Sequence, residues 1–102
     1  MIEDYRNYDA LGLAELVKKG DLSASELLAT AVSLANAGNE RINAVTRFTE
    51  KRAEQRAAAL PDSPLAGVPF LIKDLVYMAG EPCTYGSRLY KDHVPDHDAT
   101  IV

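Results

Sequence analysis

The stretch Leu65-Ala-Gly-Val-Pro-Phe-Leu-Ile-Lys-Asp-Leu75 places two adjacent charges directly after an apolar run. The run, residues 68–72, contains no polar side chain, which is typical of strands that helices cover on both faces. Pro69 has no backbone N–H to donate to a neighbouring strand, so it belongs near the start of such a strand. We therefore predict a buried strand at residues 68–72 that ends at Lys73 and Asp74.

Lys73 and Asp74 admit two interpretations. Charges at the end of a strand are most often simply solvated. However, the C-terminal ends of strands are where α/β sheets place their ligand sites. A lysine held against an apolar strand is also easily desolvated, and desolvation makes the neutral amine available as a base. The residues themselves leave both interpretations open: an ordinary surface pair, or a lysine that transfers protons.

Two helices are predicted before this strand. The first, residues 10–19, has Asp9 as its N-cap, lysines in its last turn and Gly20 just past its end. The second, residues 24–37, follows the capping box Ser23-Ala-Ser-Glu26. Apolar residues recur at helical spacing in both segments. We expect them to form an antiparallel helical pair.

A short strand and a third helix are predicted between this pair and the apolar run. Residues 42–48 contain β-branched and aromatic side chains in rough alternation, which indicates a strand. Residues 50–59 are rich in strong helix formers, and their charges suit a solvated face. The segment from Pro61 to Pro64 closes this helix.

The composition excludes several classes of protein. The chain has 102 residues, a formal net charge of −4 and a hydrophobic fraction of 47%, which is ordinary for a globular protein. Its basic residues are scattered, so we expect no nucleic-acid partner. No secretory signal is visible and no apolar run approaches the roughly eighteen residues of a membrane span. With a single cysteine, Cys83, the chain suits a reducing compartment, and we expect it in the cytoplasm without membrane attachment.

Three other groups of residues could carry chemistry. His93 and His97 have helical spacing, but Pro95 lies between them, so the geometry of a helical two-histidine zinc site is not expected. No basic residue or histidine lies beside Cys83 in the sequence to stabilise a thiolate, which favours a structural thiol. The residues Tyr85-Gly86-Ser87 are most simply a turn. We predict no metal and no cofactor.

Three segments together resemble a known family. They are Pro64-Leu-Ala-Gly-Val-Pro-Phe-Leu-Ile-Lys-Asp-Leu75, Cys83-Thr-Tyr-Gly-Ser-Arg-Leu-Tyr90 and Val94-Pro-Asp-His-Asp-Ala-Thr-Ile-Val102. In this order and at this spacing, they resemble the N-terminal part of the amidase signature family of serine amidohydrolases. The resemblance extends over essentially the whole chain, including the leading helices.

The resemblance implies a fold and an activity. The fold is α/β, a large mixed sheet wrapped by helices, of which residues 1–102 would supply the N-terminal helices and the first strands as one incomplete domain. The activity is hydrolysis of amide carbon–nitrogen bonds in a small-molecule substrate by a Ser, cis-Ser, Lys triad. The lysine of the motif corresponds to Lys73, the one catalytic residue predicted here.

The chain also departs from the family pattern. Neither Ser63 nor Ser87 lies in the Gly/Ser-rich setting in which the family has its two catalytic serines. A helix capped by Asp98 would reach Val102 after about one turn, too short to be stable without tertiary support. We therefore expect an inactive N-terminal fragment that self-associates or pairs with a missing C-terminal part. The alternatives are a non-catalytic truncated module and the amidotransferase-subunit branch of the same family.

Overall fold

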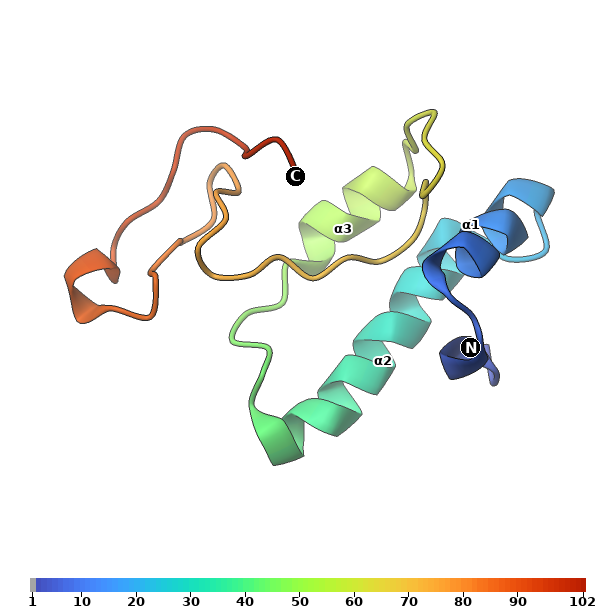
Figure 1. Ribbon diagram of the computed structural model, residues 1–102, viewed down its shortest axis with the longest axis horizontal. Helices are drawn as coiled ribbons and strands as arrows, with labels where there is room; N and C mark the ends of the chain where they lie inside the picture. The colour runs from blue at the N-terminus through green and yellow to red at the C-terminus, as the bar shows by residue number, and fades with distance from the viewer. Residues whose placement is uncertain (1) are drawn as a thin grey trace. The chain divides into compact units, whose positions relative to one another are not determined.

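The computed structural model describes residues 2–102, which divide into two compact units. The first unit ends at Pro69 and contains the α-helices; we call it the helical unit. The second, Phe70–Val102, is built from turns and one short 3-10 helix, and we call it the loop unit. Figure 1 shows the three helices of the first unit and the irregular path of the second. The assignment of residues 1–102 to one incomplete domain stays a prediction.

Helix α1, Ala10–Lys19, has the bounds that the sequence predicts. The Asp9 side chain accepts a hydrogen bond from the Gly12 N–H at 2.8 Å, which satisfies one of the free donors of the first turn. Gly20 ends the helix in the left-handed conformation, with φ of 79°, and its N–H bonds to carbonyls of the last turn. A short 3-10 helix, η1 (Tyr5–Asn7), precedes α1.

Helix α2, Ala24–Ile42, begins at the predicted capping box. The Glu26 N–H donates to Ser23 Oγ at 3.2 Å, and the Ser23 N–H donates to Glu26 Oε2 at 2.9 Å. The bonds from Ser23 hold the pKa of the Glu26 carboxyl below its ordinary value. The helix runs past its predicted end at residue 37, because one internal glycine costs only about 1 kcal/mol. Within residues 2–102, no helix is both long and apolar enough to cross a membrane.

The strand predicted at residues 42–48 is wrong. Ile42 is the last residue of α2, and residues 43–49 have no regular structure. Asn43 ends the helix with φ of 47°, and the Asn39 side chain then takes both backbone groups of Val45, donating to its carbonyl and accepting from its N–H, each at 2.8 Å. A strand forms only when its backbone groups pair with a neighbouring strand. Here a side chain has replaced that neighbour.

The strand predicted at residues 68–72 is also wrong. This segment is extended but pairs with no other segment, and none of residues 2–102 lies in a strand. The Val68 N–H closes a turn onto the Leu65 carbonyl at 3.1 Å. Phe70 and Leu71 are 68% and 74% exposed, so the apolar run is not a core segment of the described chain. The predicted α/β fold class, with the first strands of a large mixed sheet, is therefore contradicted: residues 2–102 form helices, turns and irregular segments but no strand.

The buried residues of the helical unit lie on α1 and α2. They are Leu13, Ala14, Ala24, Leu27 and Thr30. Helix α3, Glu50–Ala57, packs against α2 and ends before its predicted limit at residue 59.

Gly67 packs the end of the helical unit against this core. Its φ is 82°, and a Cβ at this position would lie 3.0 Å from Val17 Cγ1 and 3.2 Å from Ala24 Cβ. Only glycine meets both demands without strain. The glycine of the Leu65–Leu75 stretch thus anchors the chain just before it enters the loop unit.

Candidate active site

Lys73 lies at the start of a tight turn in the loop unit. The Lys73 carbonyl accepts hydrogen bonds from the Leu75 N–H at 2.7 Å and from the Val76 N–H at 3.0 Å. Instead of ending a strand, the charged pair therefore begins a reversal of the chain. Lys73 is exposed, and residues 2–102 do not surround it with the apolar environment that a neutral lysine requires.

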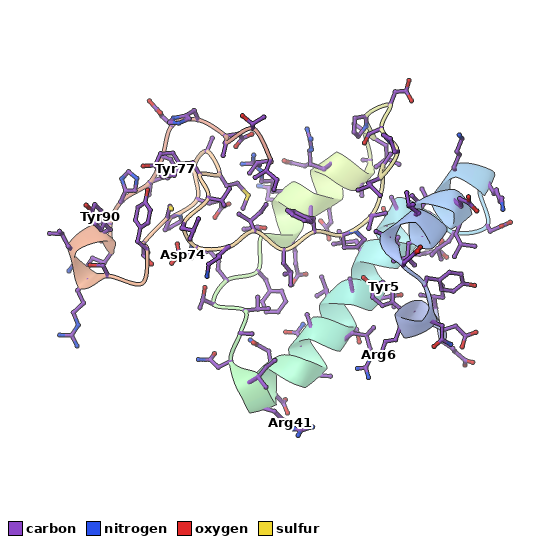
Figure 2. All side chains as sticks on the ribbon, viewed as in Figure 1. Tyr5, Arg6, Arg41, Asp74, Tyr77 and Tyr90 are labelled. Atoms are coloured by element: carbon purple, nitrogen blue, oxygen red, sulfur yellow. The ribbon has the colours of Figure 1, made fainter. Side chains whose placement is uncertain are left out.

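Asp74 connects this turn to the Thr84-Tyr-Gly-Ser87 motif. The Thr84 N–H donates to Asp74 Oδ1 at 2.7 Å, and the Thr84 hydroxyl donates to Asp74 Oδ2. Both oxygens of one carboxylate thus hold one residue, ten positions further along the chain. Asp74, Tyr77 and Tyr90 all project from the loop unit (Figure 2). Two segments that the sequence shows as separate motifs are in direct contact.

The Thr84–Ser87 segment is a turn, as predicted. The Ser87 N–H bonds to the Thr84 carbonyl at 2.9 Å, and the two central residues, Tyr85 and Gly86, have φ of 53° and 65°. A left-handed conformation is common for glycine but uncommon for tyrosine. The turn therefore needs support from outside its own backbone.

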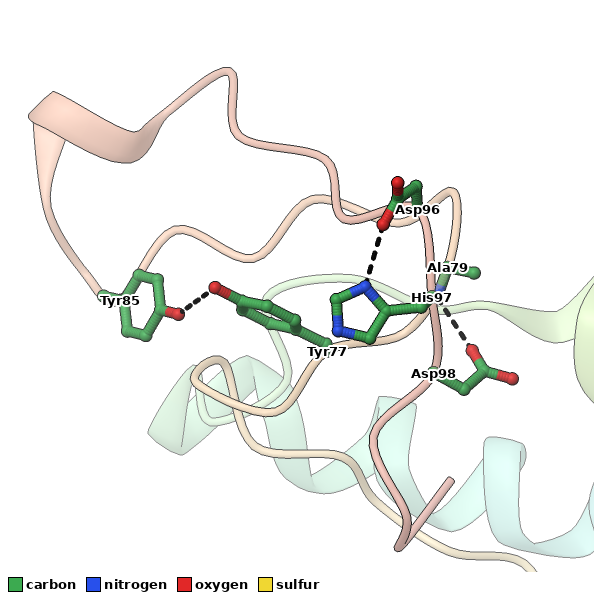
Figure 3. Close-up of polar contacts among 6 residues, drawn as sticks. All are labelled: Tyr77, Ala79, Tyr85, Asp96, His97 and Asp98. Atoms are coloured by element: carbon green, nitrogen blue, oxygen red, sulfur yellow. Dashed lines mark hydrogen bonds and ion pairs between the residues drawn. The ribbon is translucent and has the colours of Figure 1, made fainter.

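Tyr77 supplies part of this support. The Tyr85 hydroxyl donates to the Tyr77 hydroxyl at 2.9 Å, and the two rings meet edge to face (Figure 3). This hydrogen bond, together with burial, raises the pKa of Tyr85 from 10.0 to about 12. Ionisation of Tyr85 would remove the donated proton, so the neutral phenol is favoured.

The third motif, at residues 94–102, lies against the same segment. The Ala99 N–H donates to the Tyr77 carbonyl at 2.8 Å, and the Ala79 N–H donates to Asp98 Oδ1 at 2.8 Å (Figure 3). The helix expected to start at Asp98 is absent from the described chain: residues 100–101 form a turn. The Asp98 carboxylate caps a loop N–H rather than a helix. All three motifs therefore meet around residues 74–79.

Aromatic side chains form an open hollow of about 360 Å³ beside this junction. It is lined by Tyr77, Tyr85, Tyr90 and His93. Within residues 2–102, His93 Nε2 is buried without a hydrogen-bond partner. The ring of Tyr90 belongs to the 3-10 helix η2, Arg88–Tyr90, whose N-cap Ser87 ends the turn described above.

The remaining candidate residues, His93, His97 and Cys83, also lie in the loop unit. His93 and His97 each contact the Tyr77 ring, with centroids 5.5 and 5.2 Å apart. His97 Nδ1 lies 2.8 Å from Asp96 Oδ1, and this hydrogen bond lowers the pKa of the Asp96 carboxyl (Figure 3). No group of three or more metal-ligating side chains gathers in the described part of the chain. Cys83 is buried, which suits the structural thiol expected of it.

A family model described as Amidase matches residues 26–102. The chain belongs to the amidase family. The match covers α2 from Glu26 onward, all of α3 and the whole loop unit, and thus every motif joined around residues 74–79.

Curated relatives of this amidase-family chain have several names. A 6-aminohexanoate-cyclic-dimer hydrolase of Pseudomonas sp. (strain NK87) is 38% identical over 92% of the chain. A glutamyl-tRNA(Gln) amidotransferase subunit of Salinispora tropica is 35% identical over 97% of the chain, and a lipoamidase of Enterococcus faecalis is 35% identical over 97%. The chain spans only 20%, 22% and 14% of the lengths of these three relatives.

Sequence reasoning singled out Lys73 in this amidase-family chain but missed Tyr77. Its hydroxyl and its carbonyl both serve the site, yet nothing in the residues around it distinguishes it from an ordinary surface tyrosine. The contact between Asp74 and Thr84 was equally invisible, since a side chain's distant partner leaves no periodic pattern in the sequence. The short spacing between the charged pair and the Thr-Tyr-Gly-Ser motif was the one available signal.

Proposed function

We propose that this chain forms the lysine-bearing part of an enzyme that hydrolyses amide carbon–nitrogen bonds, with Lys73 as the base of a Ser, cis-Ser, Lys triad. The observation that carries the proposal is the family match over residues 26–102, which includes Lys73. The names of two relatives, a cyclic-dimer hydrolase and a lipoamidase, support hydrolysis of an amide substrate.

The proposed chemistry assigns one proton path. The neutral Lys73 amine accepts a proton from the bridging serine, which takes a proton from the nucleophilic serine as its oxygen bonds to the substrate carbonyl carbon. When the carbon–nitrogen bond breaks, the proton returns along the same path to the leaving amine. Residues 1–102 contain no Gly/Ser-rich stretch, so we assign both serines to a further part of the protein.

That further part must also enclose Lys73. The amine can act as a base only when it is neutral, and removal from water favours the neutral form of a lysine. Phe70, Leu71 and Leu75 are exposed apolar side chains near Lys73 in the sequence. We assign them to the surface that the serine-bearing part covers, which makes this part the principal partner of residues 1–102.

The test is a pH–rate profile of the full-length protein encoded by the reading frame that contains residues 1–102. Lys73→Ala should lower kcat by about 10³-fold or more, since general-base catalysis contributes on this order. Lys73→Arg should be nearly as inactive, because a guanidinium stays protonated at any working pH. Lys91→Ala, at an exposed lysine of the same unit, is the matched control and should retain activity. An arginine variant with wild-type turnover would contradict the proton-transfer role.

A second candidate is the amidotransferase branch, because the relatives include subunits of glutamyl-tRNA(Gln) amidotransferase. A stand-alone hydrolase should release amine from simple amides without any partner protein. A member of the amidotransferase branch should instead require its partner proteins and an acceptor for full turnover. If the reading frame encodes no Gly/Ser-rich stretch and the protein is not labelled by a fluorophosphonate, the result would favour the third interpretation, a non-catalytic truncated module.

A further inference from the structure

The carboxylate of Asp74 is placed to control the geometry around Lys73. Asp74 directly follows Lys73, and the chain reverses there, with the Leu75 and Val76 N–H groups on the Lys73 carbonyl at 2.7 and 3.0 Å. The backbone of Lys73 and the side chain of Asp74 therefore belong to one small hydrogen-bonded turn. A residue that donates hydrogen bonds to the Asp74 carboxylate is thus held at a defined position relative to the Lys73 backbone.

The Asp74 carboxylate accepts two hydrogen bonds from Thr84. One oxygen accepts from the Thr84 backbone N–H at 2.7 Å, and the other accepts from the Thr84 hydroxyl. Hydrogen bonds to an ionised carboxylate are among the strongest in proteins. Two bonds from different groups of one residue fix its orientation as well as its distance. This pair of bonds, which we call the Asp74–Thr84 clamp, sets both the backbone and the rotamer of Thr84.

The rotamer of Thr84 in turn supports the left-handed turn. Thr84 Oγ1 donates to Asp74 and accepts from the Gly86 N–H at 3.3 Å. Gly86 and Tyr85 are the two residues with positive φ in this turn. Left-handed residues persist only where their surroundings hold them, and such sites are frequent near active centres. Through Thr84, the clamp therefore links the turn at Lys73 to the conformation of the Thr84–Ser87 turn.

We infer that Asp74 is a positioning residue of the proposed amidase, one that holds the Thr84–Ser87 turn at a fixed place relative to Lys73. This inference rests on the proposed function of Lys73. Asp74 transfers no proton in this inference. Its carboxylate affects the rate only by fixing the position of the turn relative to the lysine. A displacement of about 1 Å by a residue outside the chemistry can cost about 10²-fold in rate.

The test compares four variants in the full-length protein. Asp74→Ala removes both bonds and should lower kcat by about 10²-fold with little change in KM. Asp74→Asn should be rescued to within about tenfold of wild type, because its amide oxygen still accepts from the Thr84 N–H and its NH₂ group donates to Thr84 Oγ1. Thr84→Val removes the hydroxyl alone and should cost less than Asp74→Ala. Asp92→Ala, at an exposed carboxylate of the same unit, is the matched control and should leave kcat unchanged.

The pH–rate profile separates a positioning role from a role of the charge. If Asp74 positions the turn, Asp74→Asn keeps the wild-type profile, in which activity rises with pH as the Lys73 amine becomes neutral. A profile displaced in Asp74→Asn would show that the charge acts on Lys73, and would overturn the inference. So would Asp74→Asn being as slow as Asp74→Ala, or Asp74→Ala keeping the wild-type kcat.

The double variant and Lys73→Ala complete the design. Asp74→Ala with Thr84→Val should lose less than the sum of the two single losses, since both single variants already break the bond between the Thr84 hydroxyl and Asp74. Additive losses would contradict this. If Lys73→Ala is inactive and Asp74→Ala is fully active, the inference fails while the proposed function stands. If Lys73→Ala retains wild-type turnover, the proposed function fails, and the inference that depends on it fails too.

Discussion

At the scale of single residues, the site is held by side chains that bond to a distant part of the chain. Asp74, Tyr77 and Asp98 each bond to a residue at least eight positions away. These bonds hold the loop unit together in place of the sheet that the sequence led us to expect. Local patterns did predict Asp9, Ser23 and Gly20 at helix ends, because a cap acts within one turn of its own helix.

The hydroxyl pair of Tyr77 and Tyr85 makes a residue-scale prediction. Tyr77→Phe removes the acceptor of the Tyr85 O–H, so the raised pKa of Tyr85, about 12, should fall toward 10.0. Tyr90→Phe is the control: its ring contacts Tyr85 edge to face and this contact remains in the variant, so the pKa should stay high. Titration of the Tyr85 ring by NMR measures the change.

The hydroxyl pair of Tyr77 and Tyr85 also predicts that the free energy of unfolding decreases at alkaline pH. The folded state binds the Tyr85 proton more tightly than the unfolded state, since its folded pKa of about 12 exceeds 10.0. The resulting stabilisation is fully present below pH 10 and is lost as the pH rises toward 12. Tyr77→Phe should flatten this alkaline decline in urea unfolding. A decline of equal steepness in wild type and variant would show that the hydroxyl pair does not cause it.

At the scale of elements, helices are the parts that the sequence predicts best. Residues 10–19 form α1 as predicted, and α2 and α3 begin at their predicted first residues, 24 and 50. The ends are less well predicted, because glycine at position 38 did not stop α2 and the chain ended it at Asn43 instead. A helix satisfies its own backbone, so its start can be recognised locally, whereas each predicted strand needed a partner.

Gly67 and Gly80 allow a matched test of the packing at the end of the helical unit. Both have positive φ, 82° and 78°, but a Cβ would clash with Val17 and Ala24 only at Gly67. Gly80→Ala should cost about 1–2 kcal/mol for the left-handed conformation alone. Gly67→Ala should cost about 1–3 kcal/mol more, because it also overpacks the core. Urea unfolding measures both, and equal losses would show that the contacts at Gly67 yield without cost.

At the scale of the whole molecule, residues 2–102 leave much apolar surface exposed. Large exposed side chains occur in both units and include Leu11, Ile42, Phe70, Leu71, Leu89 and Ile101. Exposed apolar patches mark interaction surfaces or association hazards. The proposed partner for this surface is the serine-bearing part of the enzyme.

The isolated chain should therefore self-associate and show no turnover. We expect the sedimentation coefficient of residues 1–102 to rise with protein concentration, and Phe70→Ser with Leu71→Ser to weaken this rise, since both side chains are more than two-thirds exposed. Leu11→Ser, which changes an exposed apolar residue of the helical unit, is the variant for comparison. A monomeric profile at all concentrations, or amide hydrolysis above background, would contradict the expectation.

Sequence patterns were enough to establish the helix starts, the family and the residue proposed as the base. Capping signals, apolar periodicity and the order of the three motifs are all local or linear properties, which a sequence displays directly. Only the folded chain revealed that residues 42–48 and 68–72 are not strands, and that Asp74 holds Thr84 while Tyr77 holds Tyr85. These outcomes depend on which backbone groups find partners across the chain, and the free energy of a hydrogen bond depends on a geometry that no linear pattern records.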